Sequence, residues 1–215
     1  MAAAEQGPVA EGLVSRVKNI LLAPNTEWTR IELEPATVKG LFVGYACILA
    51  AIGPIASLIG GQLVGYHAFF VSYHPSIVSG IIRAILQYVL GLAGVFLLGL
   101  VIEALAPTFD GTKDRLQAMK VAVYSSTASW VAGIFGIFPP LAILSLVGLY
   151  SLYLLYLGLP KLMKSPQEKA LAYTAVCVLA YIVIFVVVGA VSSAVVGAGM
   201  LGAAGAAGVT TPTVG

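Results

Sequence analysis

Charged residues are scarce in this sequence. Asp, Glu, Lys and Arg make up 9% of its 215 residues, whereas an ordinary soluble domain carries about 25%. Because a water-soluble globule needs a charged surface, this scarcity excludes the soluble globular class. Hydrophobic residues make up 60% and the mean hydropathy is +1.00, which indicates an integral membrane protein. The eleven basic and nine acidic residues nearly balance, so we expect no nucleic-acid partner.

Residues and motifs that carry chemistry are also few. The two cysteines, Cys47 and Cys177, lie in apolar runs and form no C-x-x-C pair. The sequence contains no Walker motif, no G-x-S-x-G and no H-E-x-x-H. We therefore expect no enzyme activity, no metal site and no cofactor. The first 36 residues lack the hydrophobic core of a signal peptide, so we expect the first membrane span to act as the insertion signal.

Long apolar runs define the expected architecture. A helix needs about 20 apolar residues to cross the hydrocarbon core of a bilayer. Five runs meet this length, which predicts an all-α, polytopic bundle of five transmembrane helices within residues 37–195. The spans are expected at about residues 39–62, 79–105, 119–138, 141–159 and 171–191. Pro139 and Pro140 predict a tight hairpin between the third and fourth spans, and Pro54 predicts a kink in the first.

The basic residues predict the orientation, because Lys and Arg concentrate on the cytoplasmic side of inner membranes. The expected loops place ten of the eleven on one side, namely Arg16, Lys18, Arg30, Lys39, Lys113, Arg115, Lys120, Lys161, Lys164 and Lys169. Arg83, near the start of the second span, is the basic residue on the other side. With an odd number of spans, we expect the N-terminus in the cytoplasm and the C-terminus outside.

The two ends of the chain differ in composition from the spans. Residues 1–36 form the expected cytoplasmic segment, in which Leu13, Val17, Ile20 and Leu21 have helical spacing and Trp28 follows before the first span. This spacing predicts either an amphipathic helix on the membrane surface or a helix packed under the bundle. Residues 196–215 are rich in Gly and Ala and uncharged, which predicts a flexible tail or an extension of the last helix.

Polar side chains gather in the expected third and fourth spans. The third span carries Tyr124, Ser125, Ser126 and Ser129, and the fourth carries Tyr150, Ser151, Tyr153 and Tyr156. Residues three apart lie on one arc of a helix, so the two sets either line a polar groove or hold the helices together by hydrogen bonds. Two charges lie within the second span, Arg83 and Glu103. They are about 30 Å apart along a helix and cannot pair, so each reaches the interface or serves a buried polar role.

Three segments together resemble a known family. The entry to the first span reads NILLAPNTEWTRIELEPAT at residues 19–37, and GYACILAAIGPIASLIG follows at residues 44–60. Residues 122–174 begin with Tyr-Ser-Ser, contain a Pro-bounded hairpin and LYSLYLLYLGLP, and end with Pro-x-x-Lys-Ala-x-x-Tyr. Over roughly residues 13–195, the chain resembles the bacterial branch of the Yip family, the Ypt-interacting-protein-like integral membrane proteins.

This resemblance implies five helices, a cytoplasmic N-terminus and a place in the cytoplasmic membrane of a bacterium. The eukaryotic branch carries an Asp-Leu-Tyr-Gly-Pro motif and is linked to small GTPases. The motif is missing here, so GTPase binding is not supported. Ala128 stands where relatives often have a proline, which puts in doubt the kink that such a proline would make.

The sequence leaves two functions to weigh. The first is a non-enzymatic scaffold or adaptor that organises membrane partners or lipid, with the bilayer, a membrane-protein partner or a second copy as its contacts. The second is a small-solute or ion permease that works through the polar groove between the third and fourth spans. Short loops and the missing catalytic motifs favour the scaffold.

Overall fold

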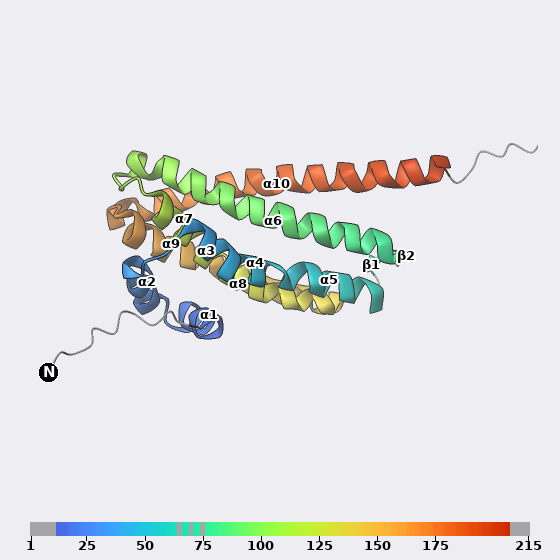
Figure 1. Cartoon of the computed structure of the whole chain (residues 1–215), viewed down its shortest axis with the longest axis horizontal. Coiled ribbons are helices and arrows are strands. Elements are labelled where there is room, and N and C mark those ends of the chain that lie inside the picture. Colours follow the sequence, from blue (N-terminus) through green and yellow to red (C-terminus); the bar gives the residue numbers. More distant parts are fainter. Residues whose placement is uncertain (1–11, 64–65, 69–70, 74–75, 207–215) are drawn as a thin grey trace, which may run out of the picture.

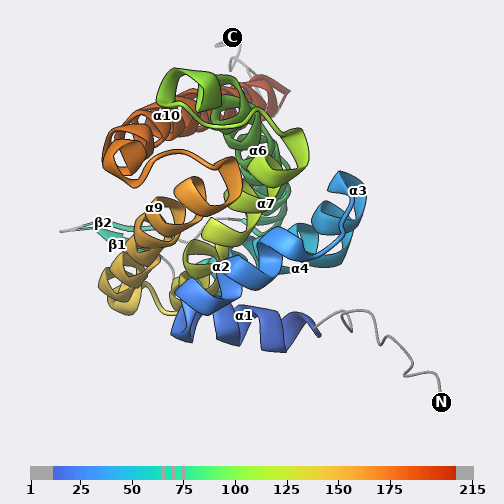
Figure 2. The ribbon, with the colours of Figure 1, turned by 90° about the vertical axis from the view of Figure 1, so that its left-hand side faces the viewer.

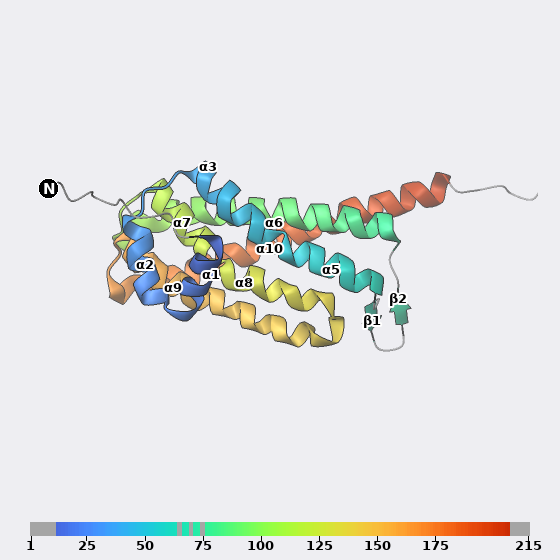
Figure 3. The same cartoon turned by 60° about the horizontal axis from the view of Figure 1, so that its bottom comes forward.

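Long helices lie side by side and form an elongated bundle in the computed structural model, which describes residues 12–63, 66–68, 71–73 and 76–206 (Figure 1). The architecture is all-α apart from one short β-hairpin. We call the end that carries α1 and α2 the cap end. The other end, where β1 and β2 join two long helices, is the hairpin end (Figure 3).

The first helical column is segmented. Its elements are α3 (Val38–Leu41), the π-helix η1 (Phe42–Ala46), α4 (Cys47–Ala50) and α5 (Ile52–Leu63). The side chain of Thr37 caps its start by accepting a hydrogen bond from Gly40 N at 3.0 Å. The α-helical pattern is interrupted at Ala51, three residues before Pro54. Because proline has no N–H, Pro54 cannot donate a helical hydrogen bond to the carbonyl of Ala50, which fits an interruption at this point. The kink stays a prediction.

A short β-hairpin and a long apolar helix follow. Strands β1 (Tyr66–Ala68) and β2 (Val71–Tyr73) pair antiparallel. Helix α6 (Ile77–Leu105) then runs back to the cap end and continues into the 3₁₀-helix η2 (Ala106–Phe109). Asp110 ends this column with a positive φ of 55°.

The third column also consists of pieces. It contains α7 (Arg115–Ser125), α8 (Thr127–Ala132) and the 3₁₀-helix η3 (Gly133–Ile137). Its start is capped by Asp114, whose carboxylate accepts from Gln117 N at 2.9 Å. Column three packs on α5 through glycines: a Cβ at Gly133 would come within 2.8 Å of the Cα of Gly53. Such contacts need small residues because the two backbones approach directly.

The chain then turns back at Phe138, where the sequence predicts a hairpin. The 3₁₀-helix η4 (Pro139–Leu149) begins there and leads into α9 (Tyr150–Met163), which packs along the third column. The last helix, α10 (Gln167–Ala206), has 40 residues and packs on α6 and α9. Residues 196–206 are therefore helical, which is the extension that the sequence left open rather than a flexible tail. Residues 207–215 lie outside the described part.

Four helices in the described part are long and apolar enough to cross a membrane, namely Val38–Leu63, Ile77–Phe109, Ile143–Met163 and Gln167–Ala190. They correspond to the expected first, second, fourth and fifth spans, with ends shifted by a few residues. The expected third span, residues 119–138, is not among them. This part of the chain is divided into α7, α8 and η3, with an interruption at Ser126.

Two short helices cover the cap end. Helices α1 (Leu13–Leu22) and α2 (Pro24–Leu33) run across the ends of the long helices, as Figure 2 shows. Pro24 ends α1 and occupies the first turn of α2, where its missing N–H breaks no helical hydrogen bond. The hydrophobic core lies mainly beneath this cap, between α1, α2, α6, α7 and α9.

Candidate functional site

The cap is built into the core of the bundle. Ile20, Trp28 and Ile31 have no exposed surface, and Leu13, Val17 and Leu21 pack against the same cluster. The Trp28 ring lies against α9, where a Cβ at Gly158 would come within 2.8 Å of Trp28 Cζ2. Of the two arrangements that the sequence left open for this segment, the structure shows the helix packed under the bundle.

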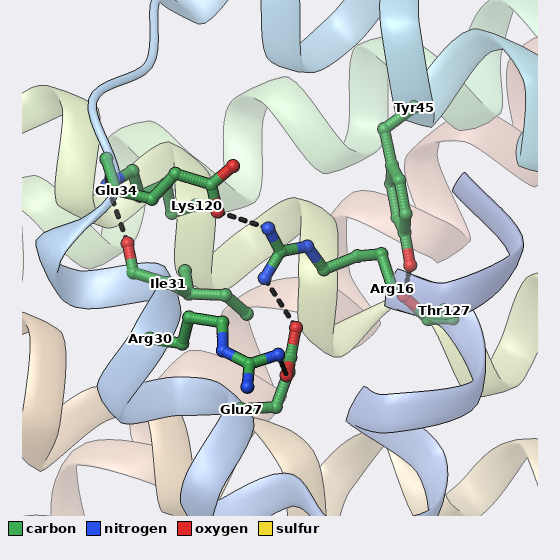
Figure 4. A network of polar contacts seen from close by, with 8 residues as sticks. All are labelled: Arg16, Glu27, Arg30, Ile31, Glu34, Tyr45, Lys120 and Thr127. Carbon is green, nitrogen blue, oxygen red and sulfur yellow. Dashed lines mark hydrogen bonds and ion pairs between the residues drawn. The ribbon is translucent and has the colours of Figure 1, made fainter. Parts of the chain in front are cut away.

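A buried ionic network fixes α1 to α2 (Figure 4). The Arg16 guanidinium donates hydrogen bonds to the carboxylates of Glu27 and Glu34. Arg16 is 4% exposed and Glu27 is 2% exposed, so this pair is shielded from water. Arg30, which is half exposed, also reaches Glu27, at 3.4 Å. A charge pair buried in this way depends on both partners, since either one alone would leave an uncompensated charge.

The electrostatics keep Arg16 protonated. Burial disfavours its charged form, but Tyr124, Glu34 and Glu27 outweigh that effect and raise the pKa of Arg16 above its ordinary value. The guanidinium also lies over the ring of Tyr124, with Cζ 5.7 Å from the ring centroid. Arg16 therefore carries its charge across the whole physiological pH range and serves as a fixed cation between the cap helices and α7.

Lys120 ties the cap to the third column. Its ammonium donates to the backbone carbonyl oxygens of Ile31 at 2.8 Å and Glu34 at 2.7 Å. These carbonyls lie at the C-terminal end of α2, where helix carbonyls lack helical partners and a cation is favoured. Lys120 is 2% exposed. In the sequence, Lys120 contributes only to the predicted orientation in the membrane, and its contact with the end of α2 was not predicted.

Aromatic contacts extend the network into the first and third columns. The ring of Tyr124 packs edge-on against Tyr45, with centroids 4.8 Å apart, and against Trp28 at 6.4 Å. The hydroxyl of Tyr45 shares a hydrogen bond of 2.8 Å with the hydroxyl of Thr127 (Figure 4). Tyr124 is thus a packing residue between the cap and two columns.

The serines of the expected groove are engaged in two different ways. Ser125 and Ser126 donate to the carbonyl oxygen of Ala122, at 3.3 and 2.8 Å. Ser129 bonds across to α9, because its hydroxyl shares a 2.8 Å hydrogen bond with the hydroxyl of Ser151 and its N–H donates to the same oxygen at 2.9 Å. The contacts of Ser125 and Ser126 therefore stay within the third span, whereas those of Ser129 with Ser151 join it to the fourth.

The tyrosines of the expected groove have separate partners. Tyr150 donates to the carbonyl oxygen of Leu21 at 3.1 Å, and its ring packs on Tyr153 at 5.4 Å. The Tyr156 hydroxyl accepts from the side chain of Gln167 at 3.3 Å. The hydroxyls of these residues thus have local, interhelical and cap partners, and the polar groove stays a prediction.

The two intramembrane charges lie at opposite ends of α6. Glu103 is largely buried and accepts a hydrogen bond of 2.6 Å from Arg115 Nε, so it belongs to the cap end. Arg83 is exposed near the hairpin end and lines a cavity of about 890 Å³. The two charges do not meet, as the sequence predicts.

This cavity lies between α4 and α5 on one side and α6, α8 and α10 on the others. Its polar lining includes Arg83, Gln87, Ser129 and Trp130, and its apolar lining comes largely from α6 and α10. A second, smaller hollow shares Arg83 and Gln87. The spacing of residues in the sequence did not reveal the cavity, because its walls come from elements that are far apart along the chain. Within the described residues, no group of three His, Cys, Asp or Glu side chains is placed to hold a metal ion.

The comparisons with known proteins agree with the membrane-helix architecture. No curated protein and no solved structure matches the chain. The family model of the Yip1 domain, however, matches residues 18–207. This range begins within α1, so it includes the second half of α1, all of α2, the helical columns and the β-hairpin. A match over most of the chain places the protein in the Yip1 domain family.

Proposed function

We propose that this Yip1-family protein is a non-enzymatic membrane scaffold of the bacterial branch. In this proposal five spans cross the cytoplasmic membrane, with the N-terminus in the cytoplasm and the C-terminus outside. The third column supplies the additional crossing, because η3 packs alongside α5 and the backbone of Gly136 and Ile137 lies against Gly60 of that helix. The concentration of basic residues at the cap end supports this orientation.

The outer face of the cap carries the scaffold proposal. Val14, Lys18 and Leu22 are spaced by four residues along α1 and therefore lie on one face of it. Val14 is 77% exposed and Leu22 is 74% exposed. The opposite face of α1 is held by the Arg16 network, so this apolar and basic stripe is presented on a fixed support. Such a surface fits a membrane-protein partner, a second copy of the chain or the lipid surface.

The test is crosslinking in intact cells with a tag on the N-terminus, followed by mass spectrometry. We expect the wild-type chain to crosslink to one membrane partner or to itself at a near-constant ratio. The substitutions Val14→Asn and Leu22→Asn together should remove that crosslink, whereas Thr26→Asn, at an exposed position of α2, should keep it. Unchanged crosslinks in the double variant would refute the role given to this face.

A permease that uses the third and fourth spans is the alternative. The Ser129–Ser151 pair supports a polar seam there, but its hydroxyls bond one another, which favours packing over a path. The combined change Tyr150→Phe, Tyr153→Phe and Ser126→Ala distinguishes the two functions. A permease should lose solute flux in liposomes while its insertion stays normal, whereas a scaffold should change only in stability or assembly.

A further inference from the structure

We propose that the cavity between α5, α6, α8 and α10 binds one anionic phospholipid. In this arrangement the headgroup phosphate lies at Arg83 and an acyl chain follows the wall that α6 and α10 form. The site is separate from the outer face of the cap, so this inference goes beyond the scaffold role and does not depend on it.

The cavity carries a positive charge that no carboxylate of the described residues neutralises. Arg83 is the sole Lys or Arg between residues 40 and 112, and residues 35–102 and 115–167 contain no Asp or Glu. The nearest carboxylate on α6 is Glu103, about 30 Å away along the helix, and it already binds Arg115. Within the described part of the chain, Arg83 has no ion pair. A charge near the hydrocarbon core is costly without a counter-ion, so an anion is the favoured occupant.

The chemistry of the cation fits a phosphate. A guanidinium presents five N–H donors in a planar fork, which matches two phosphate oxygens at once. Gln87 lies one turn deeper on the same face of α6 and lines the same cavity. Its amide N–H groups add neutral donors beside the guanidinium. The polar part of the cavity is therefore built from donors rather than from acidic acceptors.

The depth of Arg83 fits a lipid headgroup. Arg83 is the seventh residue of α6, which places it about 9 Å from the start of the helix. The 29 residues of α6 span about 43 Å, more than the ~30 Å of the hydrocarbon core. The first turns of α6 therefore extend beyond the core. Arg83 lies near its boundary, where lipid phosphates are found.

The remaining wall fits an acyl chain. Below Gln87, the cavity is lined by Gly91 and Gly94 of α6 and by Ile184, Phe185 and Val188 of α10. A Cβ at Gly91 would meet nothing within 4 Å, whereas one at Gly94 would touch Ile184 at 3.6 Å. The space is thus open at Gly91 and narrows toward Gly94. A volume of about 890 Å³ is within the range of pockets that hold small ligands, roughly 300–1,000 Å³.

The test uses the full chain, purified in detergent and stripped of lipid. Phosphatidylglycerol and phosphatidylcholine with identical acyl chains are added separately, and the bound lipid is counted by native mass spectrometry. We expect phosphatidylglycerol to bind more tightly by about tenfold, because both lipids offer a phosphate to Arg83 but the choline cation of phosphatidylcholine cancels its net negative charge and repels the guanidinium. Arg83→Gln should remove this preference. Gly91→Leu should weaken the binding of both lipids, because its side chain enters the open space of the cavity.

Two matched controls keep the result specific. Lys39→Gln removes an exposed cation at the cap end, and Gly44→Leu adds a side chain where a Cβ also meets nothing within 4 Å, outside the cavity. Both should bind lipid as the wild type does, and all four variants should elute as folded protein. Equal binding of the two lipids to the wild type would overturn the proposal, as would an unchanged preference in Arg83→Gln. Displacement of the lipid by millimolar inorganic phosphate would point to a free anion and would also overturn it.

Discussion

The ammonium of Lys120 lies 2.8 Å from the carbonyl oxygen of Ile31, although 89 positions separate the two residues along the chain. This contact joins the third column to the end of α2 inside the protein. The same ammonium reaches the carbonyl of Glu34 at 2.7 Å, so one cation closes the C-terminal end of a cap helix. It makes the cap part of the bundle rather than an appendage on the membrane surface.

Lys120→Met should loosen the cap. Methionine keeps much of the apolar stem but leaves two carbonyls of α2 without their buried donor, which costs about 1–3 kcal/mol. We expect lower thermal stability in detergent and faster proteolysis near residue 34. Lys39→Met, at an exposed position, serves as the control and should change neither. Equal melting of the two variants would show that the Lys120 contacts add nothing to stability.

The pair of Arg16 and Glu27 should show strong coupling. Removal of one partner of a buried ion pair costs about 3–5 kcal/mol, because the other charge stays buried. Arg16→Met and Glu27→Met should each destabilise the protein on this scale, and the double variant should lose much less than the sum. A double-mutant cycle in reversible detergent unfolding measures the coupling.

The exposed member of the same network is the matched control. Arg30 is 52% exposed and reaches Glu27 at 3.4 Å, so Arg30→Met should cost less than about 1 kcal/mol. If Arg30→Met and Arg16→Met were equally destabilising, burial would not be the source of the effect. Additive losses in the cycle would argue that Arg16 and Glu27 act independently.

Gly158 should be intolerant of any side chain. Its Cβ would lie 2.8 Å from Trp28 Cζ2, and overpacking of this kind costs about 1–3 kcal/mol. Gly158→Ala should therefore lower stability, even though alanine favours the helix by about 1 kcal/mol over glycine. Gly44→Ala, with nothing within 4 Å of its Cβ, should be neutral or stabilising. In a Trp28→Leu background the cost of Gly158→Ala should fall, because the ring that it meets is gone.

The approximate positions of four spans could be predicted from the sequence, because hydropathy over about 20 residues is a strong local signal. The turn at Phe138 was predictable from a different local signal, the two prolines that follow it. The interruption at Ser126 was not. At this point the hydroxyls of Ser125 and Ser126 donate to the backbone carbonyl of Ala122, a contact that can disturb a helix. Composition alone does not show whether a serine in a helix makes this contact.

The candidate site was harder to predict, because its partners are distant in sequence. Tyr150, Tyr153 and Tyr156 share an arc of one helix, yet the hydroxyls of Tyr150 and Tyr156 bond to α1 and to Gln167. Spacing along a helix predicts a shared direction but not the neighbours found there. The sequence did contain one signal for the ionic network. Charged residues are only 9% of the chain, and Arg16 and Glu27 lie next to the apolar residues Val17 and Trp28. This position made them candidates for a buried ion pair.

The five-span proposal predicts which positions face the same side of the membrane. In a background with Cys47→Ala and Cys177→Ala, single cysteines are placed at Lys113 in the cap-end loop, Ile77 at the start of α6, and Phe138 at the turn. All three positions are exposed. If residues 119–138 cross the membrane, an impermeant maleimide should label Ile77→Cys and Phe138→Cys in intact cells. Lys113→Cys should react only after permeabilisation.

Phe138→Cys is the deciding position, because residues 119–138 are the expected span that is not among the four candidate membrane helices of the described residues. Ile77→Cys is its control for the hairpin end and Lys113→Cys for the cap end. Labelling of Phe138→Cys together with Lys113→Cys would mean that residues 119–138 do not cross the membrane. The close packing of Gly133 on Gly53 argues against that outcome, because it fixes the third column beside the first, and the two columns should therefore reach the same depth.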